Sequence, residues 1–400
     1  MGDVMAYRIL SLDGGGAWAL IEVRALIALY GANASGHDVL KQFDLTAANS
    51  GGSLVMAGLI ENLPLSELLG LFLDERKRKS IFSPSRMLGN DLLRAVAGIG
   101  PKYSAAAKLP AIERLLPRTG DRPLAAAGDG VTGPAGKPVH LLVIGFDYDR
   151  SRAKFFRSQP ATGPAWGEGA PATVTLAGAV HASTNAPINY FDAPAEIPFS
   201  LDRFWDGGIS GCNNPVLAAV VEAITLGVSP GEIRALSLGT GTVHLPLAAP
   251  GAPASPFTAP RASSSLPGDL AKLAGSILDD PPDAATFIAH AVTGGSGGMS
   301  YPAVSRVIRF NPMITPVSNA GQLAAPQGWT AAQFRYLCNL DMDAVEPNDV
   351  AYIDDWCSLW LGDHVPNQPI RMQGDSTRPE VGYGHYSEAM QAWQTLFPVV

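Results

Sequence analysis

A serine between a strand pattern and a helix pattern is the first residue of this chain that could carry chemistry. Ser50 follows the strand pattern of residues 43–48 and precedes the helix pattern of residues 51–62. A nucleophile elbow needs small residues two before and two after its serine, because the turn is tight, and Ala48 and Gly52 meet that need. The positive end of the following helix also favours negative charge on the serine oxygen. The local pattern leaves two interpretations open, a nucleophile and an ordinary serine helix cap.

A run of glycines ends the first strand pattern. Gly14, Gly15 and Gly16 follow Asp13, directly after the strand pattern of residues 7–12, and a helix pattern comes next. Consecutive backbone N–H groups, with no side chains in the way, form an anion site at the start of a helix. Such a site can hold the oxyanion of a tetrahedral intermediate, and removing one donor from an oxyanion hole costs on the order of 3 kcal/mol.

The same glycines also fit a dinucleotide-binding fingerprint, G-x-G-x-x-A, which here ends at Ala19. That fingerprint expects an acidic residue at the close of the second strand, about 20 residues further on. Asp38 lies at that distance but before the second strand pattern, which ends in Ala48 and Asn49. A nucleotide- or flavin-binding protein therefore stays as the weaker alternative, and a P-loop is excluded because no Gly-Lys-Ser/Thr follows.

Asp206 is the candidate proton acceptor. It begins an Asp-Gly-Gly sequence with Gly207 and Gly208, and residues 213–215 lead from there into a helix pattern. Asp-Gly is by itself a common turn sequence, so the weight of Asp206 depends on its neighbours in the chain.

A second serine matches the G-x-S-x-G pattern letter for letter. Ser296 lies between Gly294 and Gly298, but it follows a helix pattern at residues 284–292 and precedes a strand pattern at residues 304–310. A nucleophile elbow needs the strand before the turn and the helix after it. The sequence therefore predicts a glycine-rich loop here.

Alternating strand and helix patterns must position these residues. Strands are expected at residues 7–12, 43–48, 140–146 and 234–238, and helices at 17–30, 51–62, 217–226, 332–338 and 351–361, with mostly helical chain at 63–115. Strands that alternate with helices predict an α/β fold with a parallel sheet and helices on its faces. Long loops are expected near residues 118–138, 158–172 and 247–269, and strand patterns on both sides of them favour one domain over residues 1–400.

Composition narrows the classes of function. Charged residues make up 16% of the chain, against about 25% in typical soluble domains, while 43 glycines and 33 prolines predict many turns. A net charge of −8 provides no basic field and disfavours nucleic-acid binding. Cys212, Cys338 and Cys357 stand far apart, which predicts neither disulfides nor a zinc site and favours a cytoplasmic protein. No apolar run reaches the ~18 residues of a membrane span, and neither a metal nor a cofactor is expected.

Taken in order along the chain, these residues resemble the motifs of the patatin-like phospholipase family. The family has an Asp-Gly-Gly-Gly motif after its first strand, a G-x-S-x-G elbow after its second and a late Asp-Gly-Gly/Ala sequence, and residues 13–16, Ser50 and Asp206 follow that order. Further stretches similar to the family are residues 43–45, 182–187, 190–191, 213–215, 237–241 and 340–361. The resemblance covers residues 7–361 and implies a three-layer fold with a mostly parallel central sheet and helices on both faces.

The resemblance implies a serine hydrolase that cleaves carboxylic ester bonds of lipids with a Ser–Asp dyad. Ser50 would attack the ester carbonyl, Asp206 would take its proton, and water would resolve the acyl-enzyme. Gly14, Gly15 and Gly16 would form the oxyanion hole. A carboxylate of ordinary pKa, near 3.9, is a weak base for a serine hydroxyl, so the hydrogen bond between the two groups must be short and partly desolvated.

Departures from the family pattern leave the substrate open. Family members usually carry a basic residue and a glycine where this chain has Trp18 and Ala19. A non-lipid carboxylesterase or acyltransferase on the same dyad is therefore the main alternative, and a catalytically silent binding module is another. Trp18, Asn49 and His181 are the candidates for the substrate cleft, although a lone histidine is more often structural.

One basic cluster stands out in a chain of sparse charge. Residues 76–79, Arg-Lys-Arg-Lys, follow an apolar helix pattern at residues 65–73. The cluster predicts a transient contact with anionic membrane surfaces or, as the favoured interpretation, a solvated helix face. The oligomeric state is left open.

Overall fold

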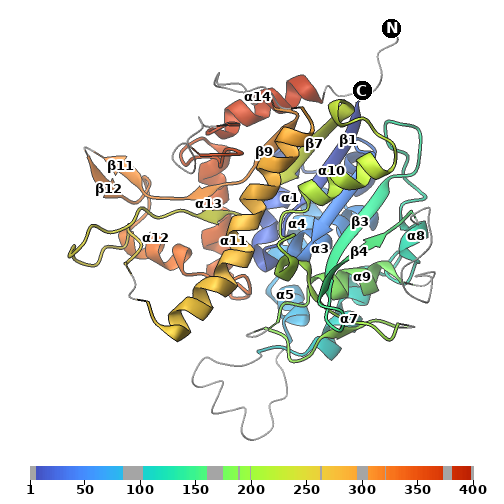
Figure 1. Ribbon diagram of the computed structural model, residues 1–400, viewed down its shortest axis with the longest axis horizontal. Helices are drawn as coiled ribbons and strands as arrows, with labels where there is room; N and C mark the ends of the chain where they lie inside the picture. The colour runs from blue at the N-terminus through green and yellow to red at the C-terminus, as the bar shows by residue number, and fades with distance from the viewer. Residues whose placement is uncertain are drawn as a thin grey trace, which may run out of the picture.

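The computed structural model describes residues 6–83, 102–159, 174–187, 190–198, 200–261, 264–294, 305–319, 321–372 and 381–397. Its centre is one eight-stranded sheet (Figure 1). Five strands run parallel in the order β3 (His140–Asp147), β2 (Leu45–Asn49), β1 (Tyr7–Leu12), β7 (Ile233–Leu238) and β9 (Val307–Phe310). Three antiparallel strands complete it: β4 (Arg152–Arg157) and β6 (Arg203–Asp206) pair with β3, and β5 (Ala195–Glu196) pairs with β6.

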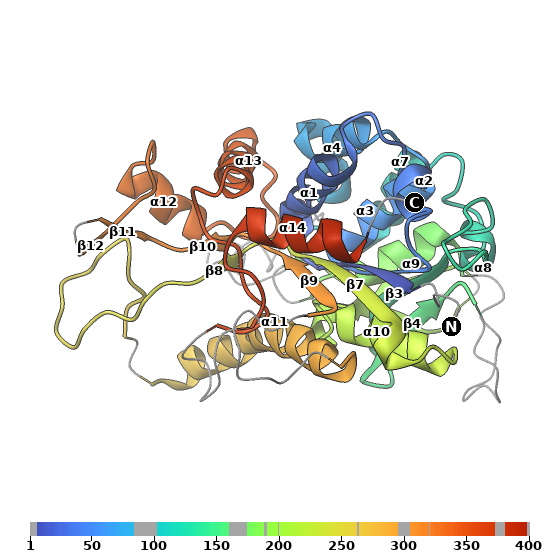
Figure 2. The ribbon, with the colours of Figure 1, turned by 90° about the horizontal axis from the view of Figure 1, so that it is seen from above.

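Helices cover both faces of the sheet, which gives three layers (Figure 2). The parallel strands are buried on both sides and are therefore nearly continuous apolar runs. Successive residues of β1 point to opposite faces: Leu10 packs with the larger apolar core and Ile9 with the smaller one. The helices of the larger core include α1 (Leu20–Tyr30), α3 (Ser50–Ile60), α9 (Leu176–Ser183), α13 (Pro347–Leu361) and α14 (Tyr386–Leu396). The opposite face is covered by α10 (Val216–Thr225) and α11 (Leu266–Val292).

Shorter elements connect these layers. The remaining helices are η1 (Gly16–Ala19), α2 (Gly36–Leu40), α4 (Leu65–Leu73), α5 (Glu75–Ile81), α7 (Ala105–Leu115), α8 (Leu124–Ala127), η2 (Gly207–Ser210), η3 (Pro230–Glu232) and α12 (Ala331–Cys338). Two small sheets are formed by β8 (Thr242–Val243) with β10 (Met313–Ile314) and by β11 (Val317–Asn319) with β12 (Gln322–Ala324). The mixed α/β class, the mostly parallel sheet and the helices on both faces confirm the prediction from sequence.

One expected loop is partly helical. The prediction placed a loop at residues 247–269 and a helix only from residue 284. The neighbouring Pro281 and Pro282 lack the N–H that a helix interior needs. In the structure α11 begins at Leu266 and runs through both prolines. Ala285 and Ala289 of α11 are buried in the smaller apolar core with residues of α10 and β9. The second G-x-S-x-G sequence, around Ser296, and most of the expected loop at 158–172 lie outside the described residues.

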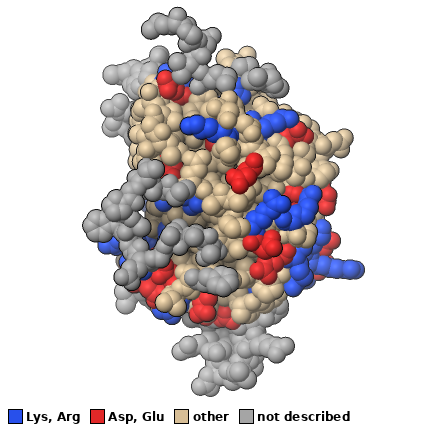
Figure 3. Space-filling view, turned by 90° about the vertical axis from the view of Figure 1, so that its right-hand side faces the viewer, with Lys and Arg blue, Asp and Glu red and all other residues tan. Residues whose placement is uncertain are grey.

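Two of the four basic residues of the cluster on α5 form contacts within the protein. Arg78 is buried and donates hydrogen bonds to the main-chain oxygens of Phe72 and Val345, at 2.6 and 3.1 Å. Lys79 pairs with the carboxylates of Glu75 at 2.6 Å and Glu346 at 3.0 Å. On the face in Figure 3, acidic and basic side chains lie interspersed between uncharged areas. Among the described helices, none combines the length and the apolar character that crossing a membrane demands.

Candidate active site

Ser50 sits on a tight turn between β2 and α3, as the elbow pattern predicts. Its φ is +46°, a left-handed backbone conformation that is strained for a residue with a side chain. The two glycines that follow let other backbone segments come close. A Cβ on Gly51 would lie 2.6 Å from the carbonyl oxygen of Gly16, and one on Gly52 would lie 2.5 Å from that of Leu12. Small residues are therefore required after Ser50 by packing as well as by the turn.

Strand β3 brings Ser50 and Asp206 together. Residues 144–147 pair with antiparallel β4 along one edge, so β2 and β6 must share the other edge. There, Asn49 at the end of β2 pairs with Ile144, and Asp206 at the end of β6 pairs with Gly145. Because β2 and β6 run in opposite directions along this edge, their carboxyl ends meet. Residues 157 positions apart in sequence thus become neighbours.

The Asp206 carboxylate accepts hydrogen bonds from neutral donors. The Ser50 hydroxyl lies beside it and lowers its pKa. The Asn49 side-chain amide donates to Oδ1 at 3.1 Å, and the main-chain N–H of Gly208 donates to the same oxygen at 2.8 Å. Asp206 is buried, and burial raises its pKa above the ordinary value, although these hydrogen bonds and the charge of Lys108 oppose the shift. A carboxylate in this setting is a stronger base than one in water.

Asn49 also connects the elbow to its surroundings. Its side-chain oxygen lies 3.5 Å from the Ser183 hydroxyl on α9, and that hydroxyl accepts the main-chain N–H of Ser50 at 2.9 Å. Its side-chain amide donates to the Asn213 side-chain oxygen at 3.3 Å. Asn49 is completely buried, so it lies behind Ser50 and Asp206 rather than on an open surface.

The glycine loop is held by three distant segments. Gly14 donates its N–H to the main-chain oxygen of Asn213 at 2.8 Å and accepts the Thr240 hydroxyl at 2.7 Å. Beyond the loop, the N–H of Ala17 donates to the Met342 carbonyl at 2.9 Å. A Cβ on Gly14 would lie 3.0 Å from the Ser50 Cβ, which shows how closely the loop approaches the serine.

The backbone N–H groups of the loop differ in availability. That of Gly14 is already engaged with Asn213. Those of Gly15 and Gly16 have no acceptor among the described residues, and Gly16 lines the cleft at Ser50. Gly15 and Gly16 are therefore better placed than Gly14 to bind an oxyanion.

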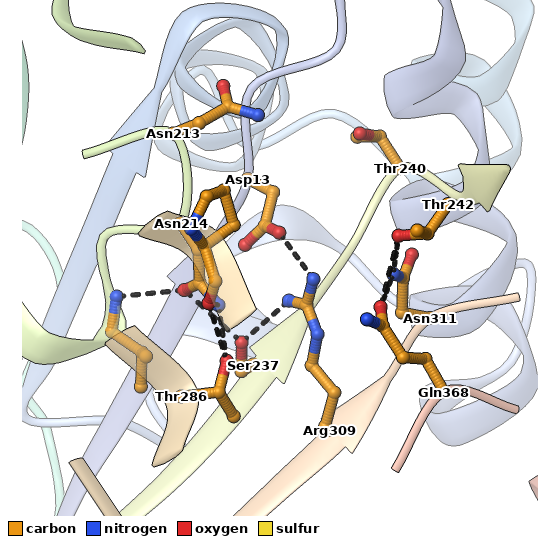
Figure 4. A network of polar contacts seen from close by, with 12 residues as sticks. Asp13, Asn213, Asn214, Ser237, Thr240, Thr242, Thr286, Arg309, Asn311 and Gln368 are labelled. Atoms are coloured by element: carbon orange, nitrogen blue, oxygen red, sulfur yellow. Dashed lines mark hydrogen bonds and ion pairs between the residues drawn. The ribbon is translucent and has the colours of Figure 1, made fainter. Parts of the chain in front are cut away.

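A buried ion pair anchors the start of the loop (Figure 4). Arg309 on β9 donates to the Asp13 carboxylate at 2.6 Å and to the Ser237 hydroxyl at 2.8 Å, and all three side chains are buried. Glu22 on α1 is also fully buried, and neither of its carboxylate oxygens has a partner among the described residues. Burial, supported by the charge of Asp13, raises the pKa of Glu22 well above its ordinary value. Asp13 keeps Arg309 as its contacting counter-ion.

Ser50 lies at a cleft with mostly apolar walls. The described residues that line it are Gly16, Ser50, Gly51, Leu54, Ile81, Phe82, Thr184, Ala186, Tyr190, Phe191 and Met342. A second, apolar cavity shares Gly16, Leu54, Ile81 and Phe82 with the cleft and extends between α3, α5 and α7 to Leu71, Phe72, Ile112 and Leu116. The cleft beside the serine and the apolar cavity thus have walls in common.

The structure places Trp18 and His181 away from the described walls of that cleft. Trp18 is buried and donates its indole N–H to the Asp341 carbonyl at 3.1 Å. His181 is buried within α9, and its Nδ1 has no partner among the described residues. Burial and the charge of Lys108 lower the pKa of His181 well below its ordinary value. Trp18 was a cleft candidate for its large apolar surface and His181 for its place beside a family motif, and both side chains are buried.

Several supporting residues were not singled out from the sequence. Ser183, Asn213, Thr240 and Met342 lie within stretches that resemble a known family, so the signal was present, but a role for each side chain needed the three-dimensional arrangement. Lys108, on α7, had no such signal. It is fully buried and acts on the Asp206 carboxylate through its charge.

Comparison with known proteins agrees with this arrangement. The sequence model of the family described as patatin-like phospholipase matches residues 10–220, more than half of the chain. The chain belongs to the patatin-like phospholipase family. The matched residues contain the glycine loop, Ser50 and Asp206, and the family indicates lipid acyl hydrolysis as the class of activity.

Two individual proteins are similar to parts of this patatin-like chain. An intracellular phospholipase A2 of Caenorhabditis elegans is 40% identical over 72 residues, which is 18% of this chain and 6% of that protein. The chain thus spans a small fraction of the length of that relative. The crystal structure of VipD from Legionella pneumophila is 12% identical, with a TM-score of 0.33, and covers 88% of this chain and 67% of that one. At that TM-score the likeness adds nothing to what the sheet itself shows.

Proposed function

We propose that this patatin-like protein hydrolyses carboxylic esters of lipids through a Ser50–Asp206 dyad. The observation that carries the proposal is the position of Ser50 next to the buried Asp206 carboxylate, to which the adjacent Asn49 donates at 3.1 Å, beside a cleft that shares apolar walls with a second cavity. A serine next to a base is the arrangement that covalent catalysis requires.

In the proposed reaction Asp206 removes the Ser50 proton while the serine oxygen attacks the ester carbonyl. The tetrahedral intermediate collapses to an acyl-enzyme, and Asp206 returns the proton to the leaving alcohol. Water then attacks the acyl-enzyme, Asp206 takes a proton from that water, and Ser50 regains one as the fatty acid leaves. The raised pKa of Asp206 makes the carboxylate a more effective proton acceptor.

Charge that develops on the substrate oxygen would be held by backbone donors. Gly15 and Gly16 supply N–H groups with no acceptor among the described residues. The N-terminus of α3, where Ser50 lies, adds a positive partial charge. Trp18 occupies the position at which the family usually carries a basic residue. We therefore favour binding through the acyl chain over binding through an anionic head group.

The apolar cavity supports a lipid over a small polar ester. Leu54 and Phe82 line both the cleft and the cavity, so an acyl chain attached at Ser50 would remove apolar surface from water along its length. We take residues 1–400 as one catalytic domain, because β1 near the start of the chain and β9 at residues 307–310 join one sheet. The three cysteines are free thiols, which supports a cytoplasmic protein. We propose that this protein meets lipid by transient contact with a membrane surface.

A hydrolysis panel tests the proposal. Phospholipid, galactolipid, triglyceride and nitrophenyl esters of short and long chains are offered to the wild type, to Ser50→Ala and to Ser66→Ala, a control on the exposed surface of α4. We expect the wild type and Ser66→Ala to cleave long-chain esters and Ser50→Ala to be inactive, with fluorophosphonate labelling lost only in Ser50→Ala. Cleavage confined to short, water-soluble esters would favour the non-lipid esterase, and hydrolysis that persists in Ser50→Ala would overturn the proposal.

A further inference from the structure

Lys108 is an unusual residue to find in the interior of this protein. Its side chain is completely buried on α7. No carboxylate of the described residues lies within ion-pair distance of it. The ammonium instead donates to the Asn185 side-chain oxygen at 2.9 Å and lies 4.0 Å from the centre of the Phe191 ring. A buried cation without a contacting counter-ion is costly, so its position calls for an explanation.

Both partners of Lys108 belong to the candidate active site. The main-chain oxygen of Asn185 accepts the N–H of Asp206 at 2.9 Å, so Asn185 helps to fix the backbone of the base. Phe191 lines the cleft at Ser50. Lys108 thus reaches the proposed proton acceptor through Asn185 and contacts the cleft wall at Phe191.

The charges around this position single out Asp206. Burial lowers the pKa of Lys108 well below its ordinary value, and the charge of Asp206 is what opposes that shift. Of the elements packed on α7, α9 presents His181, which burial and Lys108 keep neutral. On α5 the buried Arg78 is bound to main-chain oxygens, and on β5 Glu196 is exposed. Asp206 is thus the charged group on which the Lys108 ammonium acts.

We propose that Lys108 is a positioning residue of the dyad, whose buried ammonium keeps Asp206 ionised and, through Asn185, holds the Asp206 backbone beside Ser50. This inference rests on the proposed function. It separates two contributions of one side chain: a charge that acts on the carboxylate through space, and a hydrogen bond that fixes Asn185.

The charge contribution has a signature that a purely structural role lacks. The dyad works only while Asp206 is ionised, so activity falls on the acid side as the pH drops through the pKa of Asp206. Loss of a nearby cation raises the pKa of a carboxyl group, and the acid limb of the pH profile should then move to higher pH. A lysine that only filled space would lower stability or the plateau rate and leave the limb in place.

Two substitutions separate charge from hydrogen bonding. Lys108→Met removes both the charge and the bond to Asn185, whereas Lys108→Gln keeps an amide donor for Asn185 and removes only the charge. Lys154→Met is the matched control, because Lys154 also lies over a phenylalanine ring, Phe156, at 5.9 Å, but has no part in the pKa shift of Asp206. The measured quantity is kcat/KM for an ester substrate from pH 4 to pH 9, with a thermal melt for each variant.

We expect both Lys108 variants to move the acid limb upward by about 0.5–1 pH unit, less than the 1–3 units of a contacting pair, and Lys154→Met to leave it unchanged. A limb that stays in place in both folded Lys108 variants overturns the proposal, as does a shift in Lys108→Met that is absent from Lys108→Gln. If Lys108→Met does not fold, Lys108→Gln decides alone. Hydrolysis that survives Ser50→Ala overturns the proposed function, and the role of Lys108 with it.

Discussion

Two buried aspartates lie at strand ends of the same sheet, and their partners differ. Asp13, after β1, contacts the Arg309 guanidinium at 2.6 Å. Asp206, at the end of β6, is surrounded by neutral donors from Ser50, Asn49 and Gly208. Both lose water on burial, and burial raises the pKa of each; for Asp13 it reaches about 6 although Arg309 opposes the rise. Asp13 and Asp206 therefore differ in the kind of partner that each contacts, and not in the degree of burial.

The difference assigns a different task to each carboxylate. Protonation of Asp13 would leave the Arg309 cation buried without a counter-ion, which is strongly unfavourable, so this pair fixes the base of the glycine loop. Protonation of Asp206 by Ser50 leaves no contacting cation unpaired. A proton can therefore move to Asp206 and back during a reaction, whereas Asp13 is suited to hold a backbone in place.

The largest effect that would sharpen this comparison is expected from Asp206→Asn. The amide keeps the shape of the carboxylate but cannot take the Ser50 proton, so kcat should fall by about 10²–10⁴-fold, the usual contribution of a general base. The measurement is single-turnover hydrolysis of a nitrophenyl ester together with circular dichroism of the folded variant. A folded Asp206→Asn protein with near-normal turnover would show that Asp206 is not the base.

Arg309→Met tests the other half of the comparison through stability. Removing one partner of a buried ion pair costs about 3–5 kcal/mol, and urea denaturation should show this loss in the free energy of unfolding. The double variant Asp13→Asn/Arg309→Met should recover a large part of it, because no unpaired charge remains. An Arg309→Met protein as stable as the wild type would mean that Asp13 is not held by its charge.

The elbow could be predicted from the sequence because its determinants are local. The small residues around Ser50, the preceding strand pattern and the following helix pattern are consecutive in the chain, and the structure shows the tight turn with its positive φ. The parallel sheet was predictable for the same reason, since each strand is a continuous apolar run between glycine turns. Patterns of consecutive residues thus predict the geometry of the segment that contains them.

The surroundings of Asp206 could not be predicted, because they depend on pairing between distant segments. β4 and β6 are short and carry charged residues, so neither has a strong strand pattern, yet their pairing with β3 brings Asp206 to Ser50. The same holds for Arg309 and Lys108, whose burial is invisible in sequence. A lysine or arginine is expected at the surface, and only the packed structure shows that these two are inside.

The smallest effect in this comparison is expected from Asn49→Ala. Asn49 donates a hydrogen bond to the ionised form of Asp206 at 3.1 Å, and loss of such a donor raises the pKa of a carboxyl group further. Since Asp206 must be ionised to accept the serine proton, the acid limb of kcat/KM should move to higher pH by less than about 1 unit. The plateau rate above the limb should change less than in Asp206→Asn.

Thr46→Val provides the control for Asn49→Ala. Thr46 lies on the same strand, is fully buried, and its hydroxyl has no partner among the described residues. Its replacement should leave the acid limb where it is in the wild type. If both substitutions shift the limb equally, the cause is a disturbance of β2 rather than the lost donor. The pKa of Asp206 would then depend on packing and not on its neutral hydrogen-bond donors. In that respect Asp206 would resemble Asp13 more closely than we propose.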